Sequence, residues 1–570
     1  MSLKIGKVDK ICRSRLFLVL VIIFALPSLF FLFKKGNYEP HDLHHIADIY
    51  EMYRAFSSGQ FPPRFGPDFS FGFGYPLFNY YYLLPFYVGA FFVFLTKSLI
   101  LSYKLTFILP MFLSVFAMFV FLRRVFGNLP ALVGALLYTY TPYRAVQLYV
   151  RGAVGEVWIM ALLPLVAWSF LKVLSKPSLG SVASSSILLF FFLISHNYLS
   201  FLSLPLVLIL VLFLSDKVDI KRVLKYFALL ITLSLGASSY WWAPAILEKK
   251  LVSSQTPFPL YDHFPFLRQL IFPSWGYGAS LWGSGDGMSF QIGVVNLLVL
   301  FSLLLLLTFK RGLFVRRFLR LSVFLVLTFF VLVFFMNVRS YPLWRLIPFY
   351  DFIQFPWRLL IYTTFVSSLM SAVLVRVLPD RWKNVSALVI IVLSFVLTVG
   401  YFKPEKLVYK KDDDYLARFF ADRTMQGRRD SISPEYLGYS EDYLLLPKWV
   451  SERAKTKPKE KIEVTNGILS YSEINPVRYE ATVTAEKQGL VVFHSYYFPG
   501  WEVKLNGKTV PALVNQPYGD FKVEVPQGEN KIEFYWKETK LRLIFDLISV
   551  ASLLALLYIL FNGKLRERKL

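Results

Sequence analysis

The sequence predicts an α-helical, multi-pass membrane protein of about 12–13 membrane segments, with a small exoplasmic antiparallel β-sandwich inserted before the last transmembrane helix. Three observations predict this class. Hydrophobic residues make up 56% of the 570 residues, which is more than soluble domains contain. Long uncharged runs such as LFLVLVIIFALPSLFFLF at 16–33 recur along the chain. One late segment instead alternates polar and apolar residues, as strands do.

The apolar runs define the candidate membrane segments, each close to the ~20 residues that a helix needs to cross a bilayer. They cover residues 16–33, 77–95, 104–122, 130–148, 155–174, 181–195, 199–214, 223–245, 292–309, 320–336, 358–377, 385–401 and 541–561. The segment 77–95 contains Pro85 and many aromatic residues, so we expect it to be re-entrant or interfacial. Basic residues precede the first segment and no small-residue cleavage site follows it, which predicts a retained anchor.

The positive charge lies beside the membrane segments. Of the 62 Lys and Arg and 37 Asp and Glu, residues 402–540 contain 22 and 21, which leaves 40 against 16 for the rest of the chain. This distribution follows the positive-inside rule and does not indicate nucleic-acid binding. It predicts a cell-membrane protein with cytoplasmic N- and C-termini and an external segment 402–540. The single cysteine, Cys12, excludes an intramolecular disulfide.

Three parts follow from these patterns. Residues 1–401 are the predicted transmembrane domain, with a first exoplasmic loop at 34–76 and further exoplasmic loops at 246–291 and 337–357. Residues 402–540 are the exoplasmic segment, with the β-sandwich over about 465–540, and residues 541–570 are the last transmembrane helix and a basic cytoplasmic tail. Asn506-Gly507 and Gln527-Gly528-Glu529-Asn530 predict two hairpin turns in the sandwich.

The stretch HDLHHIADIYEMYRAF at 41–56 predicts an amphipathic helix that lies in the membrane plane. Its predicted polar face carries His41, His44, His45, Asp48 and Glu51. Asp42 has two interpretations, the N-cap of this helix or a general base or metal ligand with His45 as its partner. A separate hypothesis for this stretch is a zinc site formed by His41 and His45, which are spaced at i and i+4, although no HExxH motif accompanies it.

Further charged residues fall in loops assigned to the same face of the membrane. The candidates for substrate contacts are Arg64, Arg151, Glu156, Asp286, Gln354 and Arg358. Arg151 suits a phosphate ligand, or forms a salt bridge with Glu156 at a helix end. No P-loop, GxGxxG or serine-nucleophile motif is present, which argues against a nucleotide hydrolase.

Two other motifs have structural interpretations beside functional ones. His196 and Asn197 lie at a tight turn between two membrane segments, where helix capping explains them. The aromatic stretch HSYYFPGW at 494–501 either stacks on a sugar or belongs to the core of the sandwich.

Several stretches also carry a resemblance to known families. Residues 41–88, 141–156, 275–291 and 354–358 resemble the bacterial integral membrane family labelled 6-pyruvoyl-tetrahydropterin synthase-related, and GLVVFHSYYFPGWEVKLNGKTV resembles the C-terminal β-domain of YfhO-type membrane proteins. Both groups resemble the GT-C superfamily of polyprenyl-phosphate-sugar-dependent glycosyltransferases. Pterin chemistry is not implied, because the chain lacks the three-histidine zinc site of the soluble pterin enzyme in any recognisable spacing.

The resemblance implies a GT-C-like architecture and an inverting transfer of a sugar from a polyprenyl-phosphate-linked donor. The acceptor would be an envelope glycan, lipid or protein, and the partners include membrane lipid but no nucleic acid. Asp42 stands where such enzymes carry a catalytic carboxylate, and His45 would orient it. The further assignments are Arg151 and Arg358 to the donor phosphate, Glu156 and Asp286 to sugar hydroxyls or a metal, and Arg64 and Gln354 to substrate.

Two questions stay open at this point. Asp42 is followed by Leu43 and not by a second acid, so a divalent metal is an option and not a requirement. The rival hypothesis is a lipid-linked glycan transporter or a non-enzymatic envelope assembly protein, which internal repeats and paired broken helices would favour.

Overall fold

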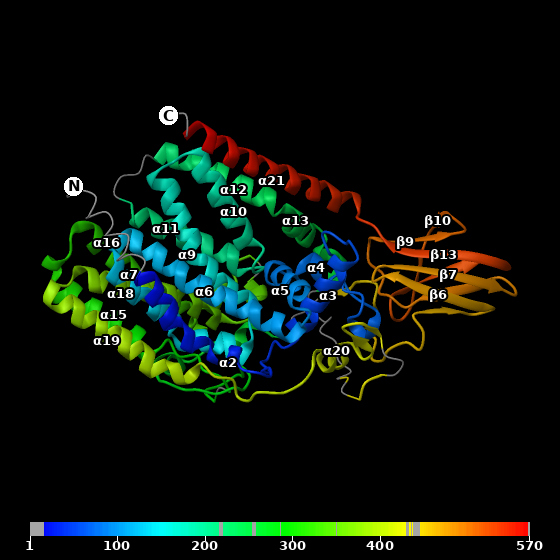
Figure 1. Ribbon diagram of the computed structural model, residues 1–570, viewed down its shortest axis with the longest axis horizontal. Coiled ribbons are helices and arrows are strands. Elements are labelled where there is room, and N and C mark those ends of the chain that lie inside the picture. Colours follow the sequence, from blue (N-terminus) through cyan, green and yellow to red (C-terminus); the bar gives the residue numbers. More distant parts are fainter. Residues whose placement is uncertain are drawn as a thin grey trace.

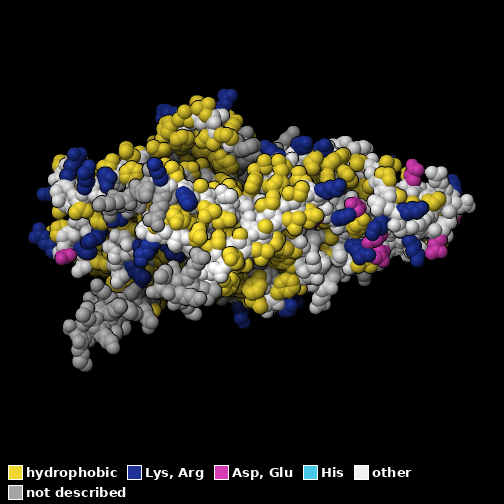
Figure 2. Space-filling view, turned by 90° about the horizontal axis from the view of Figure 1, so that it is seen from above, with side chains coloured by type: hydrophobic (Ala, Val, Ile, Leu, Met, Phe, Trp, Pro, Cys, Tyr) yellow, Lys and Arg dark blue, Asp and Glu magenta, His cyan; other side chains and the backbone are white. Residues whose placement is uncertain are grey.

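The computed structural model describes residues 16–215, 220–253, 258–285, 287–348, 350–428, 432–434, 436 and 445–567. A helical part and a strand part follow one another along the long axis of the molecule (Figure 1). The C-terminal end of α21 (Lys540–Glu567) lies at the end of the helical part that is opposite the strands. On the face in Figure 2, Lys and Arg side chains gather at that end, hydrophobic side chains cover the middle, and most acidic side chains lie on the strand part.

Within the described residues, seven helices are long and apolar enough to cross a membrane. They are Leu16–Phe33, which includes α2 (Phe30–Phe33), α6 (Leu99–Phe126), α9 (Val154–Ser175), α16 (Arg316–Phe335), Pro356–Val377 with α18 (Leu360–Val377), Asp380–Tyr401 with α19 (Asp380–Thr398), and Lys540–Asn562 in α21. An eighth span results if α12 (Ile220–Ala237) and α13 (Ser239–Leu247), which are bent by 74°, count as one. The predicted class, a multi-pass helical membrane protein, is confirmed.

Five further apolar helices are shorter than a full span. They are α5 (Leu84–Thr96), α7 (Asn128–Thr139), α10 (Leu179–Leu193), α11 (Leu199–Phe213) and α15 (Val294–Phe309). The expectation of nearly full-length segments is therefore wrong for α7, α10, α11 and α15. In the predicted segment 130–148, helix α7 stops at Thr139 because Thr141 is extended, with ψ of 144°, before Pro142.

We expected the region 77–95 to be shorter than a full span, and it is. It contains the single turn α4 (Leu77–Tyr80), a break, and then α5, whose first turn includes Pro85. The remaining short helices are α8 (Pro142–Ala145), α14 (Leu267–Ile271), α17 (Tyr341–Trp344) and α20 (Asp412–Phe420).

Helix α3 (His45–Ser57) is buried on both of its faces. His45, Asp48 and Glu51 are each at most 2% exposed, which corrects the prediction of an amphipathic helix that lies in the membrane plane. Their neighbours come from elsewhere in the segment 34–76 and from α5, since Glu51 Oε2 accepts a hydrogen bond from the backbone N–H of Asp68, and His45 packs against Phe86. Ionisable groups buried in this way need partners inside the protein.

The strand part is a sandwich of two antiparallel sheets with the orders β10-β9-β13-β7-β6 and β11-β12-β8-β5. Its strands are β5 (Ile462–Val464), β6 (Ile468–Asn475), β7 (Arg478–Ala485), β8 (Gly489–Phe493), β9 (Trp501–Leu505), β10 (Lys508–Val510), β11 (Leu513–Asn515), β12 (Asp520–Val525) and β13 (Gly528–Trp536). Two short ribbons lie outside it and pair β1 (Val252–Ser253) with β4 (Leu446–Pro447), and β2 (Arg423–Thr424) with β3 (Gly427–Arg428).

One of the two predicted hairpins is present. Leu505 pairs with Lys508 across Asn506 and Gly507, whose φ values of 49° and 80° suit a two-residue hairpin turn. The predicted hairpin at 527–530 is wrong, because β12 and β13 belong to different sheets and the chain crosses between them there.

The segment 34–76, which follows the first span, packs against the sandwich. The ring of Phe65 lies 5.6 Å from Trp501 and 5.2 Å from Trp536. The backbone N–H of Tyr496 donates to the carbonyl oxygen of Phe73 at 2.9 Å, and the side chain of Tyr496 is fully buried. The aromatic stretch 494–501 therefore belongs to the core and the joint, which is the structural one of its two interpretations.

A buried ionic cluster, the junction cluster, fastens the same joint. It consists of Asp68 and Arg54 from the first loop, Arg423 and Arg428 from the β2–β3 ribbon, and Glu473 from β6. Asp68 Oδ1 accepts from Arg423 at 2.7 Å, its other oxygen pairs with Arg54, and Glu473 accepts from all three arginines. Burial raises the pKa of Asp68, but the guanidinium groups of Arg423, Arg54 and Arg428 hold this pKa well below its usual value.

Candidate functional site

The segment 141–156 places Arg151 and Glu156 opposite one another across a turn. Helix α8 runs into a π-helix over Val146–Arg151, and α9 begins at Val154. Gly152 connects them with a φ of 67°, and a Cβ at this position would lie 2.4 Å from Pro40, so only glycine fits. Short π-helical turns are frequent at functional sites.

Glu156 is the centre of this site. Its Oε1 accepts from Arg151 Nη1 at 2.5 Å and from Arg358 Nε at 3.0 Å. Its Oε2 accepts from the Tyr143 hydroxyl at 2.7 Å and from Gln147 Nε2 at 3.1 Å. We call these five residues the Glu156 cluster. Because both carboxylate oxygens of Glu156 already have two donors and the side chain is buried, the predicted contact of Glu156 with sugar hydroxyls is not supported.

Arg358 enters the cluster from the start of the span Pro356–Val377. Its Nη1 donates to the carbonyl oxygen of Ile353 at 2.7 Å and lies 3.4 Å from Gln354 Oε1. Gln354 has a φ of 58°, a left-handed conformation that is uncommon outside glycine and often marks functional sites. The guanidinium of Arg151 lies 4.6 Å above the ring of Trp357. Stacking and hydrogen bonds thus fix both arginines in place.

Asp42 lies at the open side of this cluster. Its backbone N–H donates to the carbonyl oxygen of Arg151 at 2.8 Å. Its carboxylate lies 3.8 Å from Arg151 Nη2, and 32% of the side chain is exposed. The N-cap of α3 is His44, without a side-chain capping bond, so the N-cap interpretation of Asp42 is wrong.

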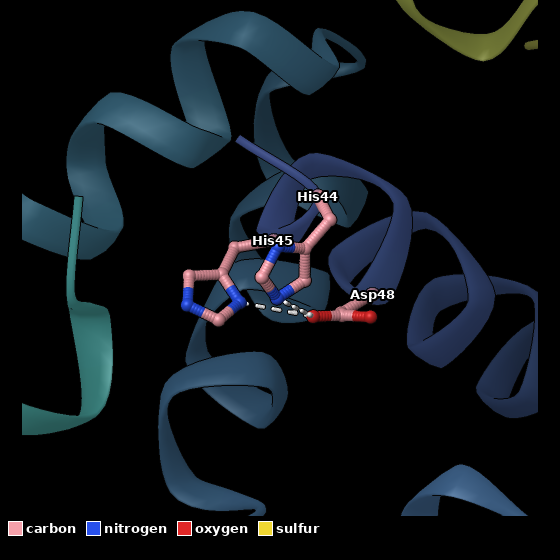
Figure 3. Close-up of side chains that lie close together, drawn as sticks. All are labelled: His44, His45 and Asp48. Carbon is pink, nitrogen blue, oxygen red and sulfur yellow. Dashed lines mark hydrogen bonds and ion pairs between the residues drawn. The ribbon is translucent and has the colours of Figure 1, made fainter. Parts of the chain in front are cut away.

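His44, His45 and Asp48 converge at the start of α3 (Figure 3). His45 Nδ1 lies 2.9 Å from Asp48 Oδ2, and His44 Nε2 lies 3.9 Å from the same oxygen. The other ring nitrogen of His45, Nε2, lies 3.4 Å from the Tyr82 hydroxyl. Both nitrogens of His45 therefore face other groups than Asp42, which corrects the prediction that His45 orients Asp42.

The zinc pair predicted from His41 and His45 is also wrong. His41 Nε2 lies 2.8 Å from the carbonyl oxygen of Tyr277 in the loop before α15, and its side chain is exposed. Because α3 begins only at His45, the i, i+4 spacing does not place His41 on the same helical face.

Burial dominates the electrostatics of the neighbouring histidines. It lowers the pKa of His45 well below its usual value and raises the pKa of Asp48 to about 7. Burial, and then the nearby Arg358, lower the pKa of His196 to about 3. His196 Nδ1 accepts from the backbone N–H groups of Tyr198 and Leu199 at the start of α11, which confirms its capping role.

Two predicted site residues do not join this arrangement. Arg64 is fully buried and donates to Tyr240 O at 2.6 Å, to Asp546 at 2.7 Å and to Glu538 at 3.3 Å. All three of its nitrogens are used, so Arg64 anchors α21 and the segment before it, and we assign it no substrate contact. Asp286 lies outside the residues that the structure describes.

The contacts above bring together the other predicted residues Asp42, Arg151, Glu156, Gln354 and Arg358. The sequence also contained signals for partners that were not predicted. Tyr143 and Gln147 lie inside the same motif as Arg151, and Trp357 lies beside Arg358. The spacing of His44 and Asp48 at i, i+4 was visible as well, but only the helix start at His45 turns both side chains to the same place.

Comparisons with known proteins place this geometry in context. A family model described as 6-pyruvoyl-tetrahydropterin synthase related domain, a membrane protein, matches residues 78–404, which include Arg151, Glu156 and Arg358 but not Asp42. An uncharacterized protein of Lactococcus lactis subsp. cremoris (strain MG1363) is 25% identical over 242 residues, which are 40% of this chain and 39% of that protein.

Among solved structures, the arabinofuranosyltransferase AftD from Mycobacteria matches with a TM-score of 0.43 and 11% identity. The match covers 92% of this chain and 60% of that one. At this TM-score the likeness does not by itself assign a fold or an activity.

Proposed function

The chain belongs to the 6-pyruvoyl-tetrahydropterin synthase related family of membrane proteins, and on this premise we propose that it is a membrane glycosyltransferase. It transfers a sugar from a polyprenyl-phosphate-linked donor to a glycan, lipid or protein of the cell envelope, on the exoplasmic face. One observation carries the proposal. A half-buried carboxylate, Asp42, lies 3.8 Å from Arg151, which Glu156 holds together with a second arginine, Arg358, in a multi-pass membrane protein.

The reaction assigns a role to each of these groups. The oxygen of an acceptor hydroxyl attacks the anomeric carbon of the donor, and its proton passes to the Asp42 carboxylate. The bond between the anomeric carbon and the phosphate oxygen breaks, and its electron pair leaves with the polyprenyl phosphate. Attack from the face opposite the phosphate inverts the anomeric centre.

The arginines stabilise the phosphate that departs. Guanidinium groups bind phosphate oxygens through paired, charge-assisted hydrogen bonds. Glu156 acts through them as a positioning residue, because it holds Arg151 and Arg358 on one oxygen. We assign Gln354, whose Oε1 lies 3.4 Å from Arg358 Nη1, to the donor as well. Asp286 keeps its proposed role toward a sugar hydroxyl or a metal from the sequence alone.

The orientation is part of the proposal. The basic end of the helical part, where α21 ends, lies on the cytoplasmic side, and the sandwich and Asp42 lie outside. Cysteines introduced at exposed sandwich positions, such as Ile468 and Leu513, are then labelled by an impermeant reagent in intact cells. Labelling only after permeabilisation would reverse the orientation.

The test of function compares Asp42→Asn with a matched carboxylate in the same loop. Asparagine keeps the size of Asp42 but is not a base, so we expect a loss of about 10²-fold or more in transfer, with unchanged melting temperature. Glu39→Gln removes a carboxylate that pairs with Arg418, outside the site, and retains transfer. The readout is mass analysis of lipid-linked sugars and envelope glycans in a deletion strain that carries each variant.

The outcomes separate the proposal from its rival. A strain with Asp42→Asn should match the deletion strain, with unused lipid-linked sugar and one envelope sugar missing. Wild-type glycans with Asp42→Asn would remove Asp42 from catalysis. If the purified protein moves a lipid-linked sugar across the membrane of vesicles without transferring the sugar to an acceptor, the transporter hypothesis replaces the glycosyltransferase hypothesis.

A further inference from the structure

His44, His45 and Asp48 form a cluster that the proposed transfer reaction does not use. The three ligand atoms lie within 4.8 Å of one another at the first turn of α3. His45 and Asp48 are buried, whereas 19% of the His44 side chain is exposed. The cluster is therefore closed on the protein side and reachable past His44.

From this geometry we infer that His44 Nε2, His45 Nδ1 and Asp48 Oδ2 bind a divalent transition-metal ion, with Zn²⁺ as the best match. Two imidazole nitrogens and one carboxylate oxygen are donors that zinc accepts, whereas calcium and magnesium prefer oxygen alone. Three protein ligands leave the fourth tetrahedral position open, as in catalytic and not structural zinc sites.

The distances suit an ion after small side-chain rotations. Two ligands of one tetrahedral zinc ion lie about 3.4 Å apart, given bond lengths of about 2.1 Å. The separations from Asp48 Oδ2 are 2.9 Å to His45 Nδ1 and 3.9 Å to His44 Nε2, which bracket that value. Figure 3 shows both rings on the same side of the carboxylate and turned toward it.

The surroundings of His45 support the assignment independently. A metal-binding histidine usually holds its second ring nitrogen on a hydrogen-bonding partner, which fixes the ring and its tautomer. Here Tyr82 provides that partner, with its hydroxyl 3.4 Å from His45 Nε2. Tyr82 is itself fixed, because its ring stacks on Phe86 and on His196.

Charge balance supports it as well. Among the described residues, Asp48 pairs with His44 and His45 and with no Lys or Arg. A buried carboxylate without a cation is costly. A divalent ion bound to Asp48 would remove that cost. One of its proposed ligands, His44, lies two residues after Asp42 in the sequence. The inference does not rest on the proposed transfer, because metal binding is measured without any activity.

The experiment measures the metal itself. The full-length protein is purified in detergent without a polyhistidine tag, stripped with chelator, dialysed against Zn²⁺ and analysed by mass spectrometry for metal content. We expect about one zinc per chain in the wild type, as a single three-ligand site predicts. His41→Ala, which removes an exposed histidine only three residues from His44, keeps that zinc, and His44→Gln and Asp48→Asn lose it.

Tyr82→Phe should weaken zinc binding only in part and leave the fold intact, so a loss of folding cannot explain its effect. It keeps the stacked ring and removes only the hydroxyl, so zinc affinity falls by about 10- to 100-fold, the usual effect of losing such a partner, while the apo-protein melts as the wild type does. Wild-type protein without zinc, or His44→Gln and Asp48→Asn proteins that bind zinc as the wild type does, would overturn the inference. A Tyr82→Phe protein with wild-type affinity would remove His45 from the ligand set.

Discussion

The junction cluster around Asp68 and the cluster around Glu156 are built from the same side chains, a buried carboxylate and several arginines, yet they differ in what lies beside them. Asp68 is enclosed by Arg54, Arg423 and Arg428. Arg54 comes from α3, whereas Arg423 and Arg428 come from the β2–β3 ribbon, and their shared partner Glu473 joins the cluster to the sandwich. Glu156 accepts from four donors, and one of them, Arg151, also reaches toward the partly exposed Asp42. The first cluster holds two parts together, and the second holds two arginines that the proposed function assigns to the donor phosphate.

Ion pairing alone therefore does not distinguish a joint between two parts of the protein from a functional site. The distinguishing feature of the Glu156 cluster is its partly exposed neighbour Asp42. Loss of a charge in the junction cluster should therefore appear as loss of stability, whereas loss of Asp42 should appear as loss of transfer alone. The predictions below test this division.

The largest expected effect is that of Asp68→Asn. The substitution keeps the shape of the side chain but leaves three arginines with one carboxylate fewer in a buried setting, which costs about 3–5 kcal/mol of unfolding free energy. Denaturant unfolding and limited proteolysis of the sandwich joint measure it. The control is Glu480→Gln, which breaks a surface pair with Arg478 that is about half exposed and worth at most about 1 kcal/mol. If both variants unfold alike, the junction cluster does not fasten the joint.

The next effect concerns acidification near the Glu156 cluster. The pKa of His196 is about 3 in the folded chain and about 6.5 in the unfolded chain, so the unfolded state binds more protons between these values and His196 lowers stability as the pH falls through this window. Between pH 7 and pH 5 this loss is about 2 kcal/mol.

His196→Asn isolates that effect. Asparagine caps helices well but does not titrate, and every other titrating group is common to both proteins. Relative to the wild type, the variant should therefore gain about 2 kcal/mol on going from pH 7 to pH 5, measured as the difference in unfolding free energy. Parallel pH profiles of the two proteins would contradict the assigned pKa.

The smallest effect tests the apolar half of the joint. Phe65→Leu removes a ring that packs on Trp501 and Trp536, and aromatic pairs contribute about 0.5–1.5 kcal/mol beyond their buried area. Thermal melting should fall slightly, with the transmembrane part unaffected. Phe61→Leu in the same loop is the control, since Phe61 is 73% exposed and its loss should leave the melting curve unchanged.

The class of the fold was predictable because hydrophobic runs and strand alternation are local patterns. Helix lengths were not, since breaks such as the one at Thr141 and Pro142 lie inside apolar runs. The hairpin at Asn506-Gly507 was predictable from two residues, whereas the crossing at 526–527 depends on which sheet each strand joins.

The candidate site shows the same limit. Arg151, Glu156 and Arg358 lie in short motifs that were visible in the sequence, and the structure brings their side chains into contact. The junction cluster was out of reach, because Asp68 and Arg423 are 355 residues apart and neither sits in a recognisable motif. Arg64 was misassigned for the same reason, since its partners Glu538 and Asp546 come from the far end of the chain.

That last contact has a consequence for biosynthesis. Arg64 pairs with Asp546, and Glu248 pairs with Arg542 at 3.0 Å, both on α21. During translation Arg64 and Glu248 are made long before these partners, and charges held at a membrane without partners are costly. The bundle is therefore completed only when α21 inserts, and a chain that stops before α21 leaves Arg64 and Glu248 without their ionic partners.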